Sequence, residues 1–142
     1  MWFTGIVLVV DGDVEVQKTI NEALAVTDYI ILHAATAQEA VSVLSRLKSI
    51  IDLLVIDLEL PDQTGVGIFE MLTTRGRRRA SRIIAKTSRQ DESFLGQVHC
   101  LGIDAILPKP ASAEQLVGTV HAVLFDLTVS EVPKAAVRKL RA

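Results

Sequence analysis

Residues 52–65 read DLLVIDLELPDQTG, and this stretch decides the fold class. The run from Leu53 to Asp57 is apolar until it ends on an acid, and the Pro61, Asp62 and Gly65 that follow are typical turn residues. A short continuous apolar run of this kind is typical of a strand buried on both faces of a parallel sheet. The stretch therefore predicts an interior strand whose carboxyl end carries Asp57.

Similar short runs alternate along the chain with helix-length amphipathic stretches. The predicted strands are Gly5 to Val10, Tyr29 to Ala34, Leu53 to Asp57, Arg82 to Thr87 and Ala105 to Leu107. The predicted helices are Val14 to Ala25, Ala37 to Lys48, Val66 to Thr74, Asp91 to Leu101 and Ala113 to Phe125. This alternation predicts an α/β fold, a five-stranded doubly wound parallel sheet with helices on both faces.

Several helix ends carry their own side-chain signals. Asp13 and Ser112 are predicted to cap the first and fifth helices, and Thr36 followed by Glu39 is the signature of a capping box. Gly102 is expected to end the fourth helix.

The composition limits the classes of protein to consider. The chain has 142 residues, 49% of them hydrophobic, with a mean hydropathy of +0.36 and a net charge of −2. Its single cysteine, Cys100, excludes an internal disulfide, and no apolar run has the length of a membrane span. These features predict a cytoplasmic protein without direct nucleic-acid or membrane partners.

Two segments stand apart from the predicted units. We expect residues 1–125 to form one domain and residues 126–142 to form a tail, with a short basic helix starting at Pro133 that acts as a linker, docking segment or dimer contact. The basic stretch from Arg75 to Arg82 is expected to be a solvated connection between the third helix and the fourth strand.

Polar residues follow the ends of the predicted strands. Asp11 and Asp13 follow the first strand, Asp57 ends the third, Thr87 ends the fourth and Lys109 follows the fifth. Because ligands of doubly wound sheets bind outside the carboxyl ends of the strands, these side chains are the candidates for chemistry.

Four pieces of sequence together resemble the receiver domain of bacterial response regulators, the family that includes the single-domain chemotaxis regulator. They are IVLVVDGD at 6–13, DLLVIDLELPDQTG at 52–65, IIAKTS at 83–88 and GIDAILPKP at 102–110. The resemblance implies a flavodoxin-like (βα)5 fold with strand order 2-1-3-4-5. It also implies that Asp57 accepts a phosphoryl group from a histidine kinase or phosphotransfer protein, that Thr87 and Lys109 contact this group, and that acidic residues hold a divalent cation.

The chemistry of these residue types agrees with that expectation. An ionised aspartate can attack phosphorus, but negative charge then accumulates, and a lysine and a cation must neutralise it. Mg²⁺ prefers a few oxygen ligands and keeps several waters, so Asp11, Asp57 and the backbone carbonyl of Glu59 form a reasonable set of ligands.

The chain also departs from the family pattern. Receivers usually carry two adjacent acids after the first strand, and Gly12 stands at the second of these positions. A weakened Mg²⁺ site is therefore expected. Asp13 is a candidate substitute, although capping the first helix is its favoured role. Ile106 replaces the usual aromatic of the fifth strand, and Ser88 replaces the small residue that usually follows the threonine.

Three functions are compatible with the sequence. The favoured one is a stoichiometric phosphoacceptor, which is not an enzyme apart from slow autodephosphorylation. Its output is expected to be protein contact on the face formed by the fourth helix, fifth strand and fifth helix, and a homodimer is one form that this contact could take. The second is a pseudo-receiver, a binding module that works without phosphorylation; Gly12 and Ile106 support it. The third is a phosphatase of the haloacid dehalogenase type, because Asp11-Gly12-Asp13-Val14 resembles the first motif of those enzymes.

Overall fold

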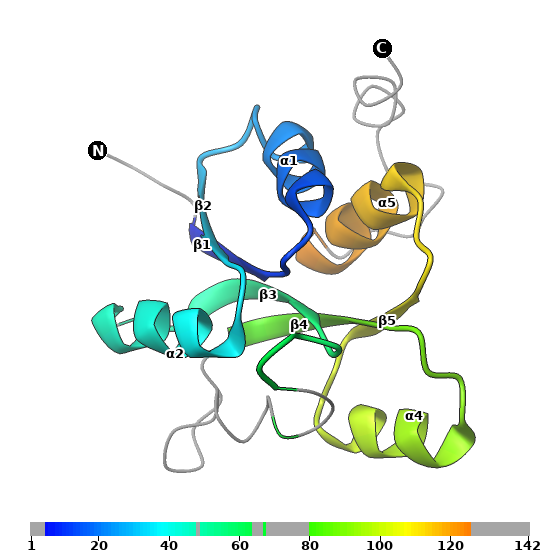
Figure 1. Cartoon of the computed structure of the whole chain (residues 1–142). Helices are drawn as coiled ribbons and strands as arrows, with labels where there is room; N and C mark the ends of the chain where they lie inside the picture. The colour runs from blue at the N-terminus through cyan, green and yellow to red at the C-terminus, as the bar shows by residue number, and fades with distance from the viewer. Residues whose placement is uncertain (1–4, 48, 64–66, 68–79, 126–142) are drawn as a thin grey trace.

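The computed structural model describes residues 5–47, 49–63, 67 and 80–125 (Figure 1). Most of the predicted third helix, Val66 to Thr74, lies outside the described residues, as do the arginines at 75–79 and the tail 126–142. The other nine of the ten predicted helices and strands are all present in the described residues.

The sheet has five parallel strands in the predicted order β2-β1-β3-β4-β5. The strands are β1 (Gly5–Val10), β2 (Tyr29–Ala34), β3 (Ile51–Asp57), β4 (Ala80–Thr87) and β5 (Ala105–Pro108). Sequence reasoning started β3 and β4 two residues late, at Leu53 and Arg82. Arg82 was predicted both to begin β4 and to end the solvated basic connection. It lies inside β4, and its guanidinium donates to the Val123 carbonyl over 3.0 Å, so the second assignment is wrong for this residue.

Four described helices cover the two faces of the sheet, as Figure 1 shows. They are α1 (Val14–Ala23), α2 (Ala37–Arg46), α4 (Glu92–Cys100) and α5 (Ala113–Leu124). One core forms between the sheet and α2 and α4, and includes Leu44 and Phe94. The other forms between the sheet and α1 and α5, and includes Ile20 and Val120.

Alternation along the strands supplies both cores at once. Every residue of β1 is buried; Leu8 and Val10 belong to the core under α2 and α4, whereas Val7 and Val9 belong to the core under α1 and α5. Each such side chain contributes about 1.5–3 kcal/mol when it is fully buried. This two-sided burial is why the strands read as apolar runs rather than as alternating polar and apolar residues.

The predicted caps are present, with one difference. Asp13 accepts from the Glu15 N–H, Ser112 and Gln115 form a complete capping box, and Gly102 adopts the positive φ of 82° expected after a helix. At α2, Thr36 accepts from the Glu39 N–H, but the Glu39 carboxylate accepts from the N–H of Ala35 over 2.8 Å and not from that of the cap residue. Among the residues that the structure describes, no helix is both long enough and apolar enough to cross a membrane.

His33 on β2 gives the folded state a dependence on pH. Its Nε2 lies 2.9 Å from Oδ1 of Asn21, and its buried Nδ1 has no hydrogen-bond partner within the described part of the chain. Burial lowers the pKa of His33 below its ordinary value of 6.5. The unfolded chain therefore takes up this proton at a higher pH than the folded chain does, and stability falls as the pH drops from the ordinary pKa towards the lower folded pKa.

We expect the urea midpoint of the protein to fall between about pH 7.5 and about pH 5.5, and to fall less in His33→Gln. Glutamine keeps a donor for Asn21 but does not titrate in this range. Since His99 and His121 are common to both proteins, the difference between the two pH profiles isolates His33. Identical profiles would show that the proton of His33 is not linked to folding.

Candidate functional site

Four ionisable side chains extend one face of the sheet past its carboxyl edge. The buried residues Val9, Val55, Ile84 and Leu107 all belong to the core under α1 and α5. Two positions further along the chain stand, in the same order, Asp11, Asp57, Lys86 and Lys109. Since side chains two residues apart in a strand point to the same face, the apolar face ends in two acids and two lysines.

Asp57 and Lys109 form the centre of the site. Nζ of Lys109 lies 2.6 Å from Oδ1 of Asp57, and the Glu59 N–H donates to the same oxygen over 2.8 Å. This contact confirms the prediction that Asp57 and Lys109 meet at the carboxyl edge. Asp57 is only 8% exposed, so the pair lies in a region of reduced dielectric.

The pKa of Lys109 reflects these neighbours. Burial lowers it, but the hydrogen bond and charge of Asp57 and the charge of Glu59 outweigh burial and raise the pKa above its ordinary value. Lys109 therefore stays charged at neutral pH. The peptide bond that follows it, to Pro110, is cis.

The side chain of Glu59 connects Lys109 with the end of β4. Its Oε2 accepts from the Thr87 hydroxyl over 2.8 Å, and its Oε1 accepts from both the N–H and the hydroxyl of Ser88 over 2.8 Å. Nζ of Lys109 lies 3.3 Å from the same Oε1. Sequence reasoning used only the backbone carbonyl of Glu59 and missed its carboxylate, because a residue in a loop gives no periodic signal of where its side chain points.

These contacts also stabilise the charged form of Glu59. Partial burial raises its pKa, but the hydrogen bonds from Ser88 and Thr87 and the charge of Lys109 together lower the pKa below its ordinary value. At neutral pH Glu59 is therefore an anion that already engages the two groups, Thr87 and Lys109, for which a phosphoryl contact is predicted.

Asp11 has a partner that the sequence analysis did not consider. Nζ of Lys86 lies 2.7 Å from its Oδ2, and the two side chains are 7% and 2% exposed. The Asp13 N–H donates to the other oxygen, Oδ1, over 2.8 Å. Alternation alone places Lys86 on the same face as Asp57, since it lies two residues after the buried Ile84, but it does not tell which acid the ammonium reaches.

The predicted ligands do not fit a resident Mg²⁺. Both oxygens of Asp11 are engaged, Gly12 offers no ligand, and the Asp13 carboxylate caps α1 through the Glu15 N–H at 2.9 Å. In the described residues no three His, Cys, Asp or Glu side chains are grouped closely enough to hold a metal ion. The expectation of weak Mg²⁺ binding thus stays a prediction, and Lys86 adds a second reason for it.

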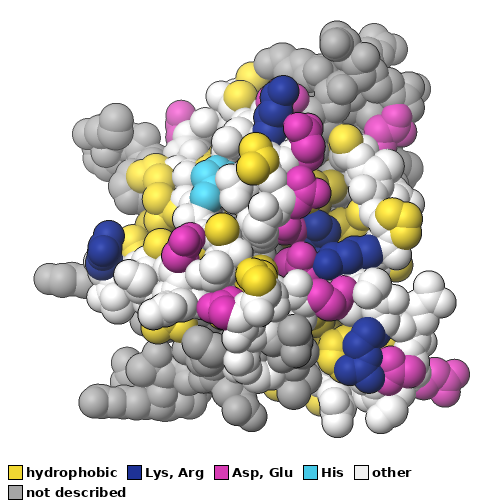
Figure 2. Space-filling model, viewed as in Figure 1, with side chains coloured by type: hydrophobic (Ala, Val, Ile, Leu, Met, Phe, Trp, Pro, Cys, Tyr) yellow, Lys and Arg dark blue, Asp and Glu magenta, His cyan; other side chains and the backbone are white. Residues whose placement is uncertain are grey.

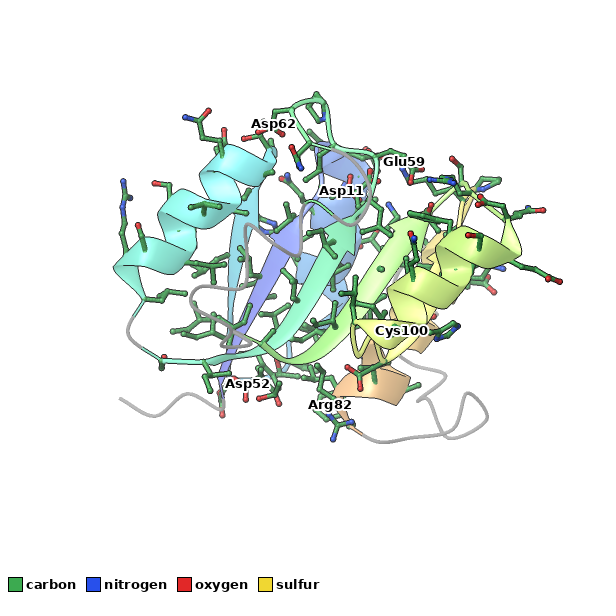
Figure 3. All side chains as sticks on the ribbon, turned by 90° about the horizontal axis from the view of Figure 1, so that it is seen from below. Asp11, Asp52, Glu59, Asp62, Arg82 and Cys100 are labelled. Atoms are coloured by element: carbon green, nitrogen blue, oxygen red, sulfur yellow. The ribbon has the colours of Figure 1, made fainter. Side chains whose placement is uncertain are left out.

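The pictures place the site at one end of the molecule. Figure 3 shows Asp11, Glu59 and Asp62 at one edge of the sheet, and Asp52 and Arg82 at the opposite edge. In Figure 2, acidic and basic side chains lie next to one another near the middle of the view. Asp11, Asp57, Glu59, Lys86 and Lys109 bring three carboxylates and two ammonium groups together, so one negative charge remains in excess.

The loop that leaves this edge is tied to α2. Asp62 accepts from the backbone N–H groups of Ala37 and Gln38, each over 3.0 Å, and these bonds lower its pKa. Together with the Thr36 cap on Glu39, they satisfy the first three N–H groups of α2.

The buried pair of Asp11 and Lys86 should be strongly coupled. Asp11→Asn and Lys86→Met should each lower the free energy of unfolding by about 3–5 kcal/mol, because each leaves a buried charge without its partner. The double variant should lose clearly less than the sum of the two, as measured by urea unfolding. The exposed pair of Arg89 and Asp91, at 2.9 Å, is the control, and Arg89→Gln should cost at most about 1 kcal/mol. Additive losses at Asp11 and Lys86 would contradict the coupling.

Comparison with known proteins agrees with this arrangement. Residues 7–121 match the family model of the response regulator receiver domain. The transcriptional regulatory protein CpxR of Escherichia coli (strain K12) is 30% identical over 118 residues, which cover 83% of this chain and 48% of that protein. The probable transcriptional regulator ycf27 of Porphyridium aerugineum is 29% identical over 120 residues, which cover 83% and 47%. The chain thus spans about half the length of the curated relatives it matches.

Solved structures share the fold. The chemotaxis response regulator CheY4 of Vibrio cholerae has a TM-score of 0.69 at 22% identity, with 84% of this chain and 98% of that chain covered. The phosphorylated cyanobacterial phytochrome response regulator RcpA has a TM-score of 0.70 at 20% identity, with 87% and 96% covered. The family model covers most of the chain, and the sheet order and the edge that carries Asp57 agree with it. The chain therefore belongs to the family of response regulator receiver domains of two-component signalling systems.

Proposed function

We propose that Asp57 accepts a phosphoryl group from a histidine kinase or phosphotransfer protein, and that the chain passes on the signal by protein contact. Receiver domains in general interact with histidine kinases and with downstream effectors, and are signalling switches rather than enzymes. The observation that carries the proposal is the contact of 2.6 Å between Nζ of Lys109 and Oδ1 of the buried Asp57 at the end of β3.

The transfer needs no further residue to act as nucleophile. An oxygen of Asp57 attacks phosphorus and forms the new P–O bond, while the bond from phosphorus to the donor breaks and the donor's leaving group keeps the electron pair. Lys109 and the Glu59 N–H, which already contact Asp57, are placed to stabilise the charge that develops. The phosphoryl group is then removed from Asp57 by hydrolysis. We expect this hydrolysis to be slow, so the protein acts stoichiometrically.

Glu59 gives the switch a resting state. Its carboxylate holds the Thr87 hydroxyl, the Ser88 N–H and hydroxyl, and one side of Lys109. A phosphoryl group on Asp57 is an anion that competes for the same donors, so it should displace Glu59 and release the loop that follows β4. A local exchange of one anion for another would in this way change a surface.

The surface that should respond lies at β5, an edge strand of the sheet, between α4 and α5 (Figure 1). The end of β4 carries Thr87, and the residues after β5 carry Lys109, so both border this face. We propose it as the docking site for a downstream protein or a second copy of the chain. Ile106 is half-buried against the core under α2 and α4, which favours a small response.

The wider assignments remain part of the same proposal. A receiver domain over residues 1–125, a tail over 126–142 as linker or docking segment, and a cytoplasmic location are compatible with everything described above. Receiver domains typically bind Mg²⁺. Here Asp11, Asp57 and the Glu59 carbonyl are the residues that would hold it, and binding is expected to be weak because both oxygens of Asp11 are already engaged. No nucleic-acid or membrane contact is proposed.

The pseudo-receiver is the second candidate, and Glu59 is the observation that favours it. A carboxylate that already occupies the predicted phosphoryl donors could hold the domain in one state permanently. Gly12 and Ile106 point in the same direction. In contrast, the phosphatase hypothesis loses support, because Asp13, the second aspartate of its motif, is engaged as the cap of α1, and Asp11, the first, is buried against Lys86.

Labelling with acetyl phosphate separates the three functions. We expect intact-mass and peptide-mapping mass spectrometry to place one phosphoryl group on Asp57 in the wild type, and none in Asp57→Asn. Asp28→Asn, which changes an exposed aspartate before β2, is the control and should label normally. If the wild type takes up no phosphoryl group even with saturating Mg²⁺, the pseudo-receiver replaces our proposal; a label on Asp11 would instead support the phosphatase.

Hydrogen exchange tests the surface that responds. Phosphorylation should increase exchange in the loop after β4, at residues 88–91, and alter exchange in α4 and β5, because Ser88 loses its bonds to Glu59. Glu59→Gln should loosen the same loop without any phosphoryl group, since a neutral amide holds Lys109 and the hydroxyls less strongly. Changes confined to α1 and α2 would place the output on a different face.

A further inference from the structure

We propose that the Lys86 ammonium occupies the cation position of this site, so that Asp57 is phosphorylated without a divalent cation. The position is defined by the predicted ligands, Asp11 and Asp57, at the adjoining ends of β1 and β3. That Lys86 fills it follows from geometry alone; that labelling needs no metal rests on the proposed function of Asp57.

The first step is the path of the Lys86 side chain. Lys86 is the register partner of Asp57 across β3 and β4, so both side chains leave the same face of the sheet side by side. The Lys86 ammonium ends 2.7 Å from Oδ2 of Asp11, which follows β1, the strand on the far side of β3. The side chain therefore crosses the end of β3, beside Asp57, and places its positive charge between the strands that carry the two acids.

The second step is burial. The Lys86 and Asp11 side chains are 7% and 2% exposed, and lysine is among the residues most rarely buried in proteins. Desolvating an ammonium is unfavourable, and the contact with the Asp11 carboxylate offsets that cost. An ion pair with so little access to water cannot exchange its ammonium for a counter-ion from solution as a surface pair can.

The third step is the loss of metal ligands. Oδ2 of Asp11 is taken by Lys86, and Oδ1 by the Asp13 N–H. Gly12 has no side chain to contribute, although a Cβ built there would meet only the Ala35 carbonyl, at an ordinary 3.5 Å. A Mg²⁺ ion at this edge would have to displace the ammonium or lie against it, and like charges at such a distance repel.

The fourth step is the charge that the reaction adds. When Asp57 takes a phosphoryl group, one negative charge becomes about −1.5 to −2. Lys109, which follows β5, contacts Asp57, while Lys86 leaves β4, the strand between β3 and β5, and extends to Asp11 after β1. Two ammonium groups therefore lie at the end of the sheet that carries the reacting carboxylate, one on Asp57 itself and one on the neighbouring Asp11. Together they supply the neutralisation for which a lysine and a metal ion would otherwise both be needed.

Mg²⁺ binding tests the occupancy of the position without any phosphorylation. By isothermal titration of the full chain with MgCl₂, we expect weak binding to the wild type and a gain on the order of 10- to 100-fold in Lys86→Gln. Gly12→Asp/Lys86→Gln should gain more than the two single variants together. Lys18→Gln, which removes an exposed lysine of α1, is the matched control and should change nothing. Equal Mg²⁺ affinity in the wild type and in Lys86→Gln would overturn the proposal.

Labelling then tests the consequence. Acetyl phosphate should label wild-type Asp57 at similar rates with Mg²⁺ and with excess EDTA, within about twofold, whereas Lys86→Gln should need Mg²⁺. Lys86→Arg keeps the charge and should stay independent of Mg²⁺. If wild-type labelling stops in EDTA, the Lys86 proposal is wrong and Asp57 remains the acceptor. If no labelling occurs under either condition, the proposed function fails, and the titration still decides the position of Lys86. Should Lys86→Gln not fold, the wild-type comparison in EDTA is sufficient.

Discussion

The charge balance at the carboxyl edge is the constraint on which the rest of the site depends. A sheet covered on both faces excludes water from the ends of its inner strands, and Asp11 and Asp57 are nearly inaccessible there. Buried carboxylates persist as ions only when cations or hydrogen-bond donors stand next to them. Lys86, Lys109 and the N–H groups of Asp13 and Glu59 meet that requirement, and they do so with groups that the chain itself supplies.

Much of the fold could be predicted because the signals are local. Apolar runs buried on both faces, the caps Asp13 and Ser112, and the positive φ of Gly102 each depend on a few neighbouring residues. The meeting of Asp57 with Lys109 was also predictable, because parallel strands place their carboxyl ends at one edge. Two local details were predicted wrongly. β3 and β4 begin earlier than predicted, and the Glu39 carboxylate accepts from the N–H of Ala35 and not from that of Thr36.

The rest of the site depends on side-chain reach, which no spacing rule gives. Lys86 has four methylenes and can end beside its own strand or two strands away; only the packed structure shows that it ends on Asp11. Glu59 lies in a loop, where no periodicity fixes a direction, and its carboxylate turns to Thr87, Ser88 and Lys109. The family pattern does not predict these contacts either, since it assigns no role to Lys86, the residue just before Thr87.

The bonds from Asp62 to α2 have a mechanical consequence for Glu59. Only residues 58–61 separate Asp57, fixed at the end of a central strand, from Asp62, fixed on the first two N–H groups of α2. Glu59 therefore sits on a short span clamped at both ends and stiffened by Pro61, whose ring restricts its backbone. A clamped span of this length has few ways to relax. When the Glu59 carboxylate breaks its hydrogen bonds to the end of β4, residues 58–61 should therefore adopt one alternative conformation rather than many. The displacement of one carboxylate by a phosphoryl group would then produce an all-or-none change.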